Sequence, residues 1–168
     1  MKLIGAMFVI CACGWFGFSL VLNHKQEEAS LGALISALDF MQCELQFHLT
    51  PLPELCSQIG RQQTDNVGKL FARISGILEL QQIPDVESCV RQGLLESPNL
   101  PERTVRAMET LGATLGRFDL PGQIAGIESV RTQCRQELES LRKNRDERLR
   151  SYQTLGLCAG AALAILFI

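Results

Sequence analysis

Residues 120–168 read LPGQIAGIESVRTQCRQELESLRKNRDERLRSYQTLGLCAGAALAILFI, and this C-terminal stretch decides the fold. Its apolar residues recur at steps of three and four, which is the spacing of one helix face. Arg145 interrupts this stripe once, and no breaker separates the stripe from the apolar residues 155–168. The stretch therefore predicts one long helix that runs from an aqueous domain into an apolar segment. The stripe consists of Ile124, Ile127, Val130, Cys134, Leu138, Leu141, Leu149 and Tyr152.

The N-terminal end carries a second apolar segment, because residues 3–22 hold no charged side chain. Twenty helical residues span about 30 Å, the thickness of the hydrocarbon core of a bilayer. A cleaved signal peptide is the main alternative, but its apolar core is shorter and ends in small residues. A lipoprotein signal is a second alternative, because Ile10-Cys11-Ala12-Cys13 resembles a lipobox, but the apolar run continues past Cys13 to Leu22. We expect transmembrane helices over residues 1–23 and 152–168, the second with modest bilayer thinning.

Charge predicts the orientation of these two segments. Basic residues gather directly before the C-terminal segment, whereas the outer ends hold few. The positive-inside rule therefore places residues 24–151 in the cytoplasm and both termini outside. The membrane-proximal basic residues also suit contact with anionic lipid headgroups; they are Arg142, Lys143, Arg145, Arg148 and Arg150. Within the C-terminal segment, Gly156 and Gly160 have the spacing that allows close helix packing in lipid.

The middle of the chain predicts an all-α bundle, because helical periodicity recurs and no sustained period-two alternation occurs. Helix caps and breakers divide residues 24–151 into two long outer helices and four short helices between them. Thr50 is predicted to cap the second helix, and Gly60 to end it. The other predicted boundaries are Asp65 as an N-cap, Pro84-Asp85 as the start of the fourth helix, Pro101 as the opening of the fifth, Gly116 as a left-handed C-cap, and Asp119 as the last N-cap.

Composition excludes several classes of function. The net charge is −2 and aromatic residues make up only 6% of the chain, so we expect no nucleic-acid partner. Seven cysteines contain no CxxC pair, which indicates buried reduced thiols rather than a metal site. Cys43 and His48 stand five apart on a helix and diverge, so no nucleophile, base and orienting group converge. The sequence predicts a protein that is not an enzyme and binds no cofactor or metal.

Two segments are more distinctive than a simple bundle requires. One spans residues 44–54, and the other spans residues 112–119 with Gln123 just beyond it. Both can be interpreted as helix corners rich in caps, or as surfaces that bind a partner. Gly112 inside a helix costs about 1 kcal/mol relative to alanine, so close packing or a partner surface should compensate.

Several short motifs occur in one order along the whole chain. They are Lys2-Leu3-Ile4-Gly5, Leu38 with Glu44, Thr50-Pro51-Leu52 with Glu54, Leu115-Gly116, Asp119 four residues before Gln123, and Tyr152 before Leu155-Gly156. In this combination the chain resembles the stage III sporulation protein AB family of endospore-forming bacteria. The resemblance implies a relative of the helical inner-membrane platform proteins of type II secretion systems. It further implies a non-catalytic subunit of a channel complex between mother cell and forespore.

The resemblance also implies partners and a location. The expected partners are a cytoplasmic ATPase, stage III sporulation protein AA, and other channel subunits, at the mother-cell side of the membrane around the forespore. An alternative function is a lipid-binding membrane anchor that recruits a soluble regulatory factor. The candidate partner-binding residues come from the two distinctive segments: Glu44, Thr50, Pro51, Leu52, Glu54, Gly112, Leu115, Gly116, Asp119 and Gln123.

Overall fold

A computed structural model of the chain is all-helical in the residues that it describes, with six α-helices and no strand. It describes the backbone of residues 2–80, 85–116 and 119–167, and the side chains of residues 25–80, 85–116 and 119–144. The all-α prediction is confirmed. The helices are α1 (Lys2–Phe47), α2 (Leu52–Gln62), α3 (Asn66–Glu79), α4 (Val86–Leu95), α5 (Glu102–Thr114) and α6 (Leu120–Phe167).

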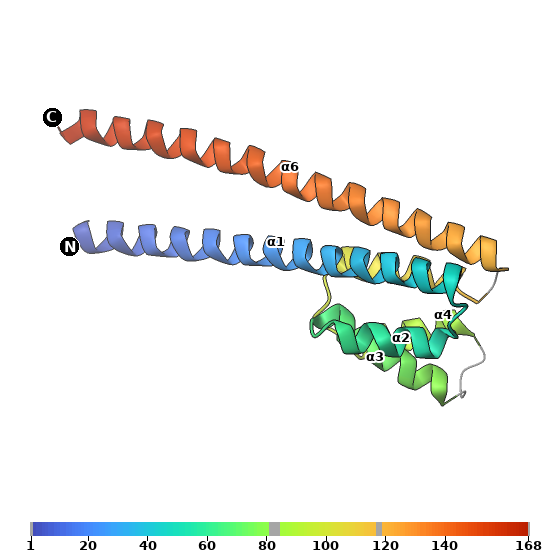
Figure 1. The fold of residues 1–168 in the computed structure, drawn as a ribbon. Coiled ribbons are helices and arrows are strands. Elements are labelled where there is room, and N and C mark those ends of the chain that lie inside the picture. The colour runs from blue at the N-terminus through green and yellow to red at the C-terminus, as the bar shows by residue number, and fades with distance from the viewer. Residues whose placement is uncertain (1, 81–84, 117–118, 168) are drawn as a thin grey trace.

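The two long helices organise the molecule (Figure 1). α1 and α6 pack against each other, and the N-terminal end of α1 lies at the same end of the molecule as the C-terminal end of α6. The short helices α2 and α3 pack against α1, α4 packs against α3 and α5, and α5 packs against α6 and α1. This arrangement agrees with the predicted two long outer helices and four short helices between them. We call the four short helices, α2–α5, the head.

One hydrophobic core joins the head to both long helices. α1 contributes side chains at steps of three and four, as its pattern predicted. The largest fully buried side chains are Leu31, Leu34, Leu38, Met41, Leu55, Ile59, Leu70, Phe71, Ile74, Met108, Leu111 and Ile127. Full burial of one such side chain contributes about 1.5–3 kcal/mol, so this core supplies the main force that holds the short helices against α1.

Most of the predicted helix starts are confirmed by hydrogen bonds. The Asp65 carboxylate accepts the backbone N–H of Gly68 at 2.8 Å, and this bond caps α3. The Asp85 carboxylate accepts the N–H of Ser88 at 3.0 Å, which caps α4. Asp119 accepts the N–H of Gly122 at 3.2 Å at the start of α6. Each bond satisfies a backbone donor that the first helical turn leaves without a partner.

The prediction that Thr50 caps α2 is wrong. Pro51 occupies the cap position, with no hydrogen bond from its side chain. The Thr50 hydroxyl instead donates to Glu44 Oε2 at 2.7 Å, six residues back along the chain. The pyrrolidine ring sets φ at the start of the helix, so α2 begins without a polar cap.

Two glycines have packing roles. The prediction that Gly60 ends α2 is wrong, because the helix continues to Gln62. A Cβ at Gly60 would lie 2.7 Å from the Cβ of Ala72, so glycine here lets α2 and α3 approach closely. A Cβ at Gly112 would lie 3.0 Å from the Cβ of Val90. Close packing of α5 on α4 therefore compensates for glycine inside α5.

Both predicted transmembrane segments lie where side chains are not described. The helical backbone of α1 and α6 continues through them. Arg145, Arg148, Arg150, Gly156 and Gly160 lie outside the described side chains, as do Leu149 and Tyr152 of the α6 stripe. Within residues 25–80, 85–116 and 119–144, no helix is long and apolar enough to cross a membrane.

Candidate functional site

The candidate residues from both distinctive segments gather at one end of the molecule. The C-terminal ends of α1, α3 and α5 and the N-terminal ends of α2, α4 and α6 all lie there (Figure 1). We call this the distal end, because it lies away from the two apolar terminal segments. Side-chain contacts connect its parts: the Ser75 hydroxyl donates to the carbonyl of Pro53 at 2.9 Å, and a Cβ on Gly116 would lie 2.8 Å from Val86 Cγ2.

The first corner, residues 44–54, is organised around the carboxylate of Glu44. Thr50 Oγ1 donates to Glu44 Oε2 at 2.7 Å, and His48 Nδ1 lies 3.4 Å from Glu44 Oε1. The backbone N–H of His48 also donates to the carbonyl of Glu44 at 2.9 Å. Between these residues, Leu49 has a φ of 54°, in the left-handed region. The side-chain bonds therefore hold the backbone in a tight turn where α1 ends and α2 begins.

This corner exposes apolar side chains that were not among the candidate partner-binding residues predicted from the sequence. Phe47 is 70% exposed and Leu49 is 66% exposed, and at the C-terminal end of α3 Leu80 is 67% exposed. Pro51 and Glu54 are also exposed. Periodicity carried no signal for the exposure of Leu49, because it follows Leu45 of the apolar α1 stripe by four residues.

The second corner, residues 112–123, combines buried supports with an exposed turn. Gly112 and Leu115 are buried, so they shape the corner from inside. Gly116 is exposed with a φ of 77°, which confirms the predicted left-handed cap after α5. Asp119 is exposed and Gln123 is half-buried in the first turn of α6. Of this group, Gly116 and Asp119 are the residues most accessible to a partner.

The distal end is acidic in the residues that the structure describes. Residues 40–56, 75–80, 85–90, 109–116 and 119–125 contain no lysine or arginine, and the sequence of the two undescribed gaps, 81–84 and 117–118, adds only Arg117. The same ranges contain Glu44, Glu54, Glu79, Asp85, Glu87, Glu109 and Asp119. Such a distribution produces a negative potential at the distal end, although the net charge of the whole chain is only −2.

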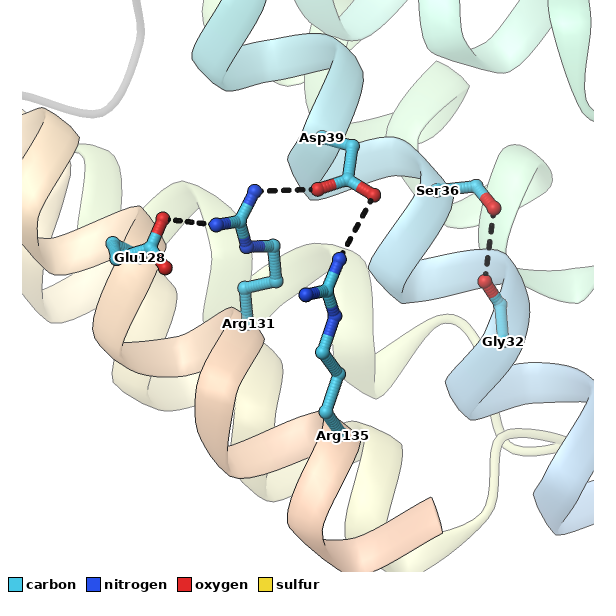
Figure 2. Close-up of polar contacts among 6 residues, drawn as sticks. All are labelled: Gly32, Ser36, Asp39, Glu128, Arg131 and Arg135. Carbon is cyan, nitrogen blue, oxygen red and sulfur yellow. Dashed lines mark hydrogen bonds and ion pairs between the residues drawn. The ribbon is translucent and has the colours of Figure 1, made fainter. Parts of the chain in front are cut away.

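An ion-pair cluster joins the two long helices (Figure 2). Arg131 Nη1 of α6 lies 2.6 Å from Asp39 Oδ1 of α1, and Arg135 Nη2 lies 3.6 Å from Asp39 Oδ2. Arg131 also donates to Glu128 one turn earlier. This hydrogen bond lowers the pKa of Glu128, and the two carboxylates raise the pKa of Arg131. The cluster holds α1 and α6 in a defined register between the two corners and the terminal segments.

The four cysteines whose side chains the structure describes are free thiols, and three of them are buried. Burial raises the pKa of the Cys56 thiol to about 12 and that of Cys134 to about 11, so both stay protonated at neutral pH. Cys89 is buried as well, whereas Cys43 is exposed, which corrects the prediction that all these thiols are buried. Among the side chains that the structure describes, no group of His, Cys, Asp and Glu is arranged to hold a metal ion.

Comparison with known proteins identifies the family. The sequence profile of the family described as stage III sporulation protein AB matches residues 2–168. The chain belongs to this family. The resemblance found in the sequence is therefore confirmed, and membership of the stage III sporulation protein AB family connects the chain to sporulation.

Two members of the stage III sporulation protein AB family resemble the chain over most of their length. The protein of that name from Bacillus subtilis (strain 168) is 24% identical over 171 residues, which cover 100% of this chain and 99% of the relative. A solved structure of a stage III sporulation protein AB aligns with a TM-score of 0.66 at 22% identity and covers 73% of this chain and 98% of its own. The structural likeness shows that the helical fold is shared.

Proposed function

We propose that this protein is a non-catalytic platform subunit of a secretion-like channel complex between mother cell and forespore. In this proposal its distal end docks a cytoplasmic ATPase, stage III sporulation protein AA, and its other surfaces contact further channel subunits. The observation that carries the proposal is the meeting of two corners, residues 44–54 and 112–123, at the distal end, opposite the apolar terminal segments (Figure 1). A subunit anchored at one end is free to present a folded surface at the other.

The proposal includes a two-pass membrane topology. Residues 1–23 and 152–168 cross the membrane around the forespore, and residues 24–151 form the cytoplasmic domain on the mother-cell side. Three observations support it: residues 3–22 and 155–168 carry no charged side chain, the backbone of both segments is helical, and the two helix ends lie at the same end of the molecule. This topology is the one we expect for a relative of the type II secretion inner-membrane platform proteins.

Charge reversal at the two corners tests the docking. Glu54→Lys and Asp119→Lys each place a positive charge on an exposed position of the distal end. We expect each variant of the full-length protein to copurify about tenfold less ATPase from sporulating cells, since reversal of an interface charge opposes association. Spore yield should fall in parallel while the protein level and the membrane fraction stay unchanged.

Glu102→Lys is the matched control. Glu102 is an exposed acidic residue in the first turn of α5, at the opposite end of the head. This variant should retain both ATPase copurification and spore yield. Normal copurification and yield in Glu54→Lys and Asp119→Lys would refute docking at the distal end.

A second candidate function is a lipid-binding anchor that recruits a soluble regulatory factor. Arg142 and Lys143 favour it, because both are exposed at the end of the described part of α6, close in sequence to the C-terminal segment. Polybasic segments beside a membrane bind anionic headgroups. If this function is the correct one, Arg142→Glu with Lys143→Glu should abolish sporulation, and the two distal charge reversals should leave it intact.

A further inference from the structure

Three large apolar side chains at the distal end are exposed. Phe47 ends α1, Leu49 lies in the first corner, and Leu80 follows α3, with 70%, 66% and 67% of their surface exposed, respectively. The core of the head is already filled by other side chains of the same helices. These three residues, which we call the distal apolar residues, belong neither to this core nor to the partly buried side chains packed against it.

Leu49 is unfavourable for the isolated protein in two respects. Its backbone φ of 54° lies in the left-handed region, which glycine and asparagine adopt more readily than leucine. Its side chain is also largely exposed to water. The packing of this fold therefore does not account for a leucine at this position.

The charges around the distal apolar residues decide what kind of occupant fits. Glu54, Glu79 and Asp119 are exposed at the distal end, and the described residues there contain no lysine or arginine. An anionic membrane surface would be repelled by these carboxylates. A second copy of this chain, docked through the same surface, would bring like charges together. A protein surface that carries basic residues is attracted, and its encounter with the distal end is accelerated.

We propose that Phe47 and Leu49 insert into an apolar pocket of a partner protein whose rim carries lysine and arginine residues. The basic rim pairs with Glu54, Glu79 and Asp119, and the pocket receives Phe47 and Leu49 as anchors. Hot spots of this kind combine a buried apolar anchor with a polar rim that excludes water. This inference rests on the proposed function, because it describes the surface that would dock the ATPase.

The first experiment separates binding from folding. Leu49→Gly relieves the backbone strain and removes the anchor, so the purified full-length variant in detergent should unfold at an equal or higher temperature than the wild type. The same variant should bind the purified cytoplasmic ATPase, stage III sporulation protein AA, at least about tenfold more weakly. Leu95→Ser is the matched control, since Leu95 is 80% exposed at the opposite end of the head. Wild-type binding by Leu49→Gly, or an equal loss in Leu95→Ser, would overturn the inference.

A second experiment identifies the partner independently of the ATPase. A photo-cross-linking residue is placed at Phe47, and in a control strain at Leu95, in the full-length protein in sporulating cells. Position 47 should cross-link to a protein at a site flanked by lysine or arginine, and the yield should fall when salt is raised in isolated membranes. A protein other than the ATPase at this site would overturn the inference, because the inference describes the surface that docks the ATPase. Failure of the purified wild-type protein to bind the ATPase would instead refute the proposed docking. Cross-links only to lipid or to a second copy, or no cross-link at position 47, would refute the inference itself.

Discussion

Arg131 of α6 and Asp39 of α1 form an ion pair across the two long helices, with 2.6 Å between Nη1 and Oδ1 (Figure 2). The side chain of Arg131 is 18% exposed and that of Asp39 is 44% exposed, so solvent screens the pair only in part. The two residues are 92 positions apart. Their contact sets how α6 lies along α1, and hence where the second corner lies relative to the first.

Loss of this ion pair should destabilise the head. We expect Arg131→Met to lower the free energy of unfolding by about 1–2 kcal/mol, because the pair is partly desolvated and the carboxylate of Asp39 loses its nearest cation. Thermal unfolding of the full-length protein, followed by circular dichroism in detergent, measures the change. Arg106→Met is the control, since its pair with Glu102 joins two exposed side chains one turn apart on α5. An equal effect in the two variants would contradict a special role for the Arg131 pair.

Two glycine substitutions should change stability in opposite directions. Gly116→Ala adds a Cβ at a φ of 77° and only 2.8 Å from Val86 Cγ2, so we expect a loss of about 1–2 kcal/mol. Gly32→Ala adds a Cβ inside α1 with no atom within 4 Å, so we expect a gain of up to about 1 kcal/mol. Urea unfolding of both variants in the same detergent measures whether the free energy of unfolding falls in Gly116→Ala and rises in Gly32→Ala.

The bond from Thr50 to Glu44 should stabilise the first corner. Thr50→Val keeps the shape of the side chain but removes the donor, so the half-buried carboxylate of Glu44 loses its 2.7 Å bond. We expect a loss of about 0.5–1.5 kcal/mol in the free energy of unfolding, together with weaker ATPase binding. Thr50→Ser retains the hydroxyl and should restore both properties. A defect in Thr50→Ser as large as that in Thr50→Val would show that the hydroxyl is not the important group.

Alkaline pH should destabilise the fold through buried thiols. In the unfolded chain Cys56 ionises near its ordinary pKa of 9.0, but burial in the folded protein raises this pKa to about 12. Between these values the unfolded state binds fewer protons, so the free energy of unfolding falls as pH rises above about 9. Each buried thiol contributes a slope of up to about 1.4 kcal/mol per pH unit in this window.

A comparison of two alanine variants tests this pH dependence. Cys56→Ala should make the fall in stability between about pH 9.5 and 11 less steep. Cys43→Ala removes an exposed thiol and should leave the slope unchanged. The slopes are compared rather than the absolute stabilities, because Cys56→Ala also removes buried volume from the core. Equal slopes in the wild type and Cys56→Ala would contradict the role assigned to this thiol.

Local sequence signals predicted most of the secondary structure. The N-caps at Asp65 and Asp119, the start of α4 at Asp85 and the left-handed Gly116 were all predicted correctly. Each depends on hydrogen bonds or backbone geometry within about one turn, which the neighbouring residues specify. Thr50 was assigned wrongly because the same local pattern also allows its hydroxyl to bond to Glu44 instead of the helix start.

The sequence by itself determined the helical class, the two long outer helices, the apolar terminal segments and the family, because spacing and composition along one chain specify them. Only the tertiary structure decided that both corners meet at the distal end, that Gly60 serves close packing with Ala72, and that Phe47 and Leu49 remain exposed. The reason is physical. These features depend on side chains from different helices, whose relative positions follow from core packing and not from the periodicity of any single helix.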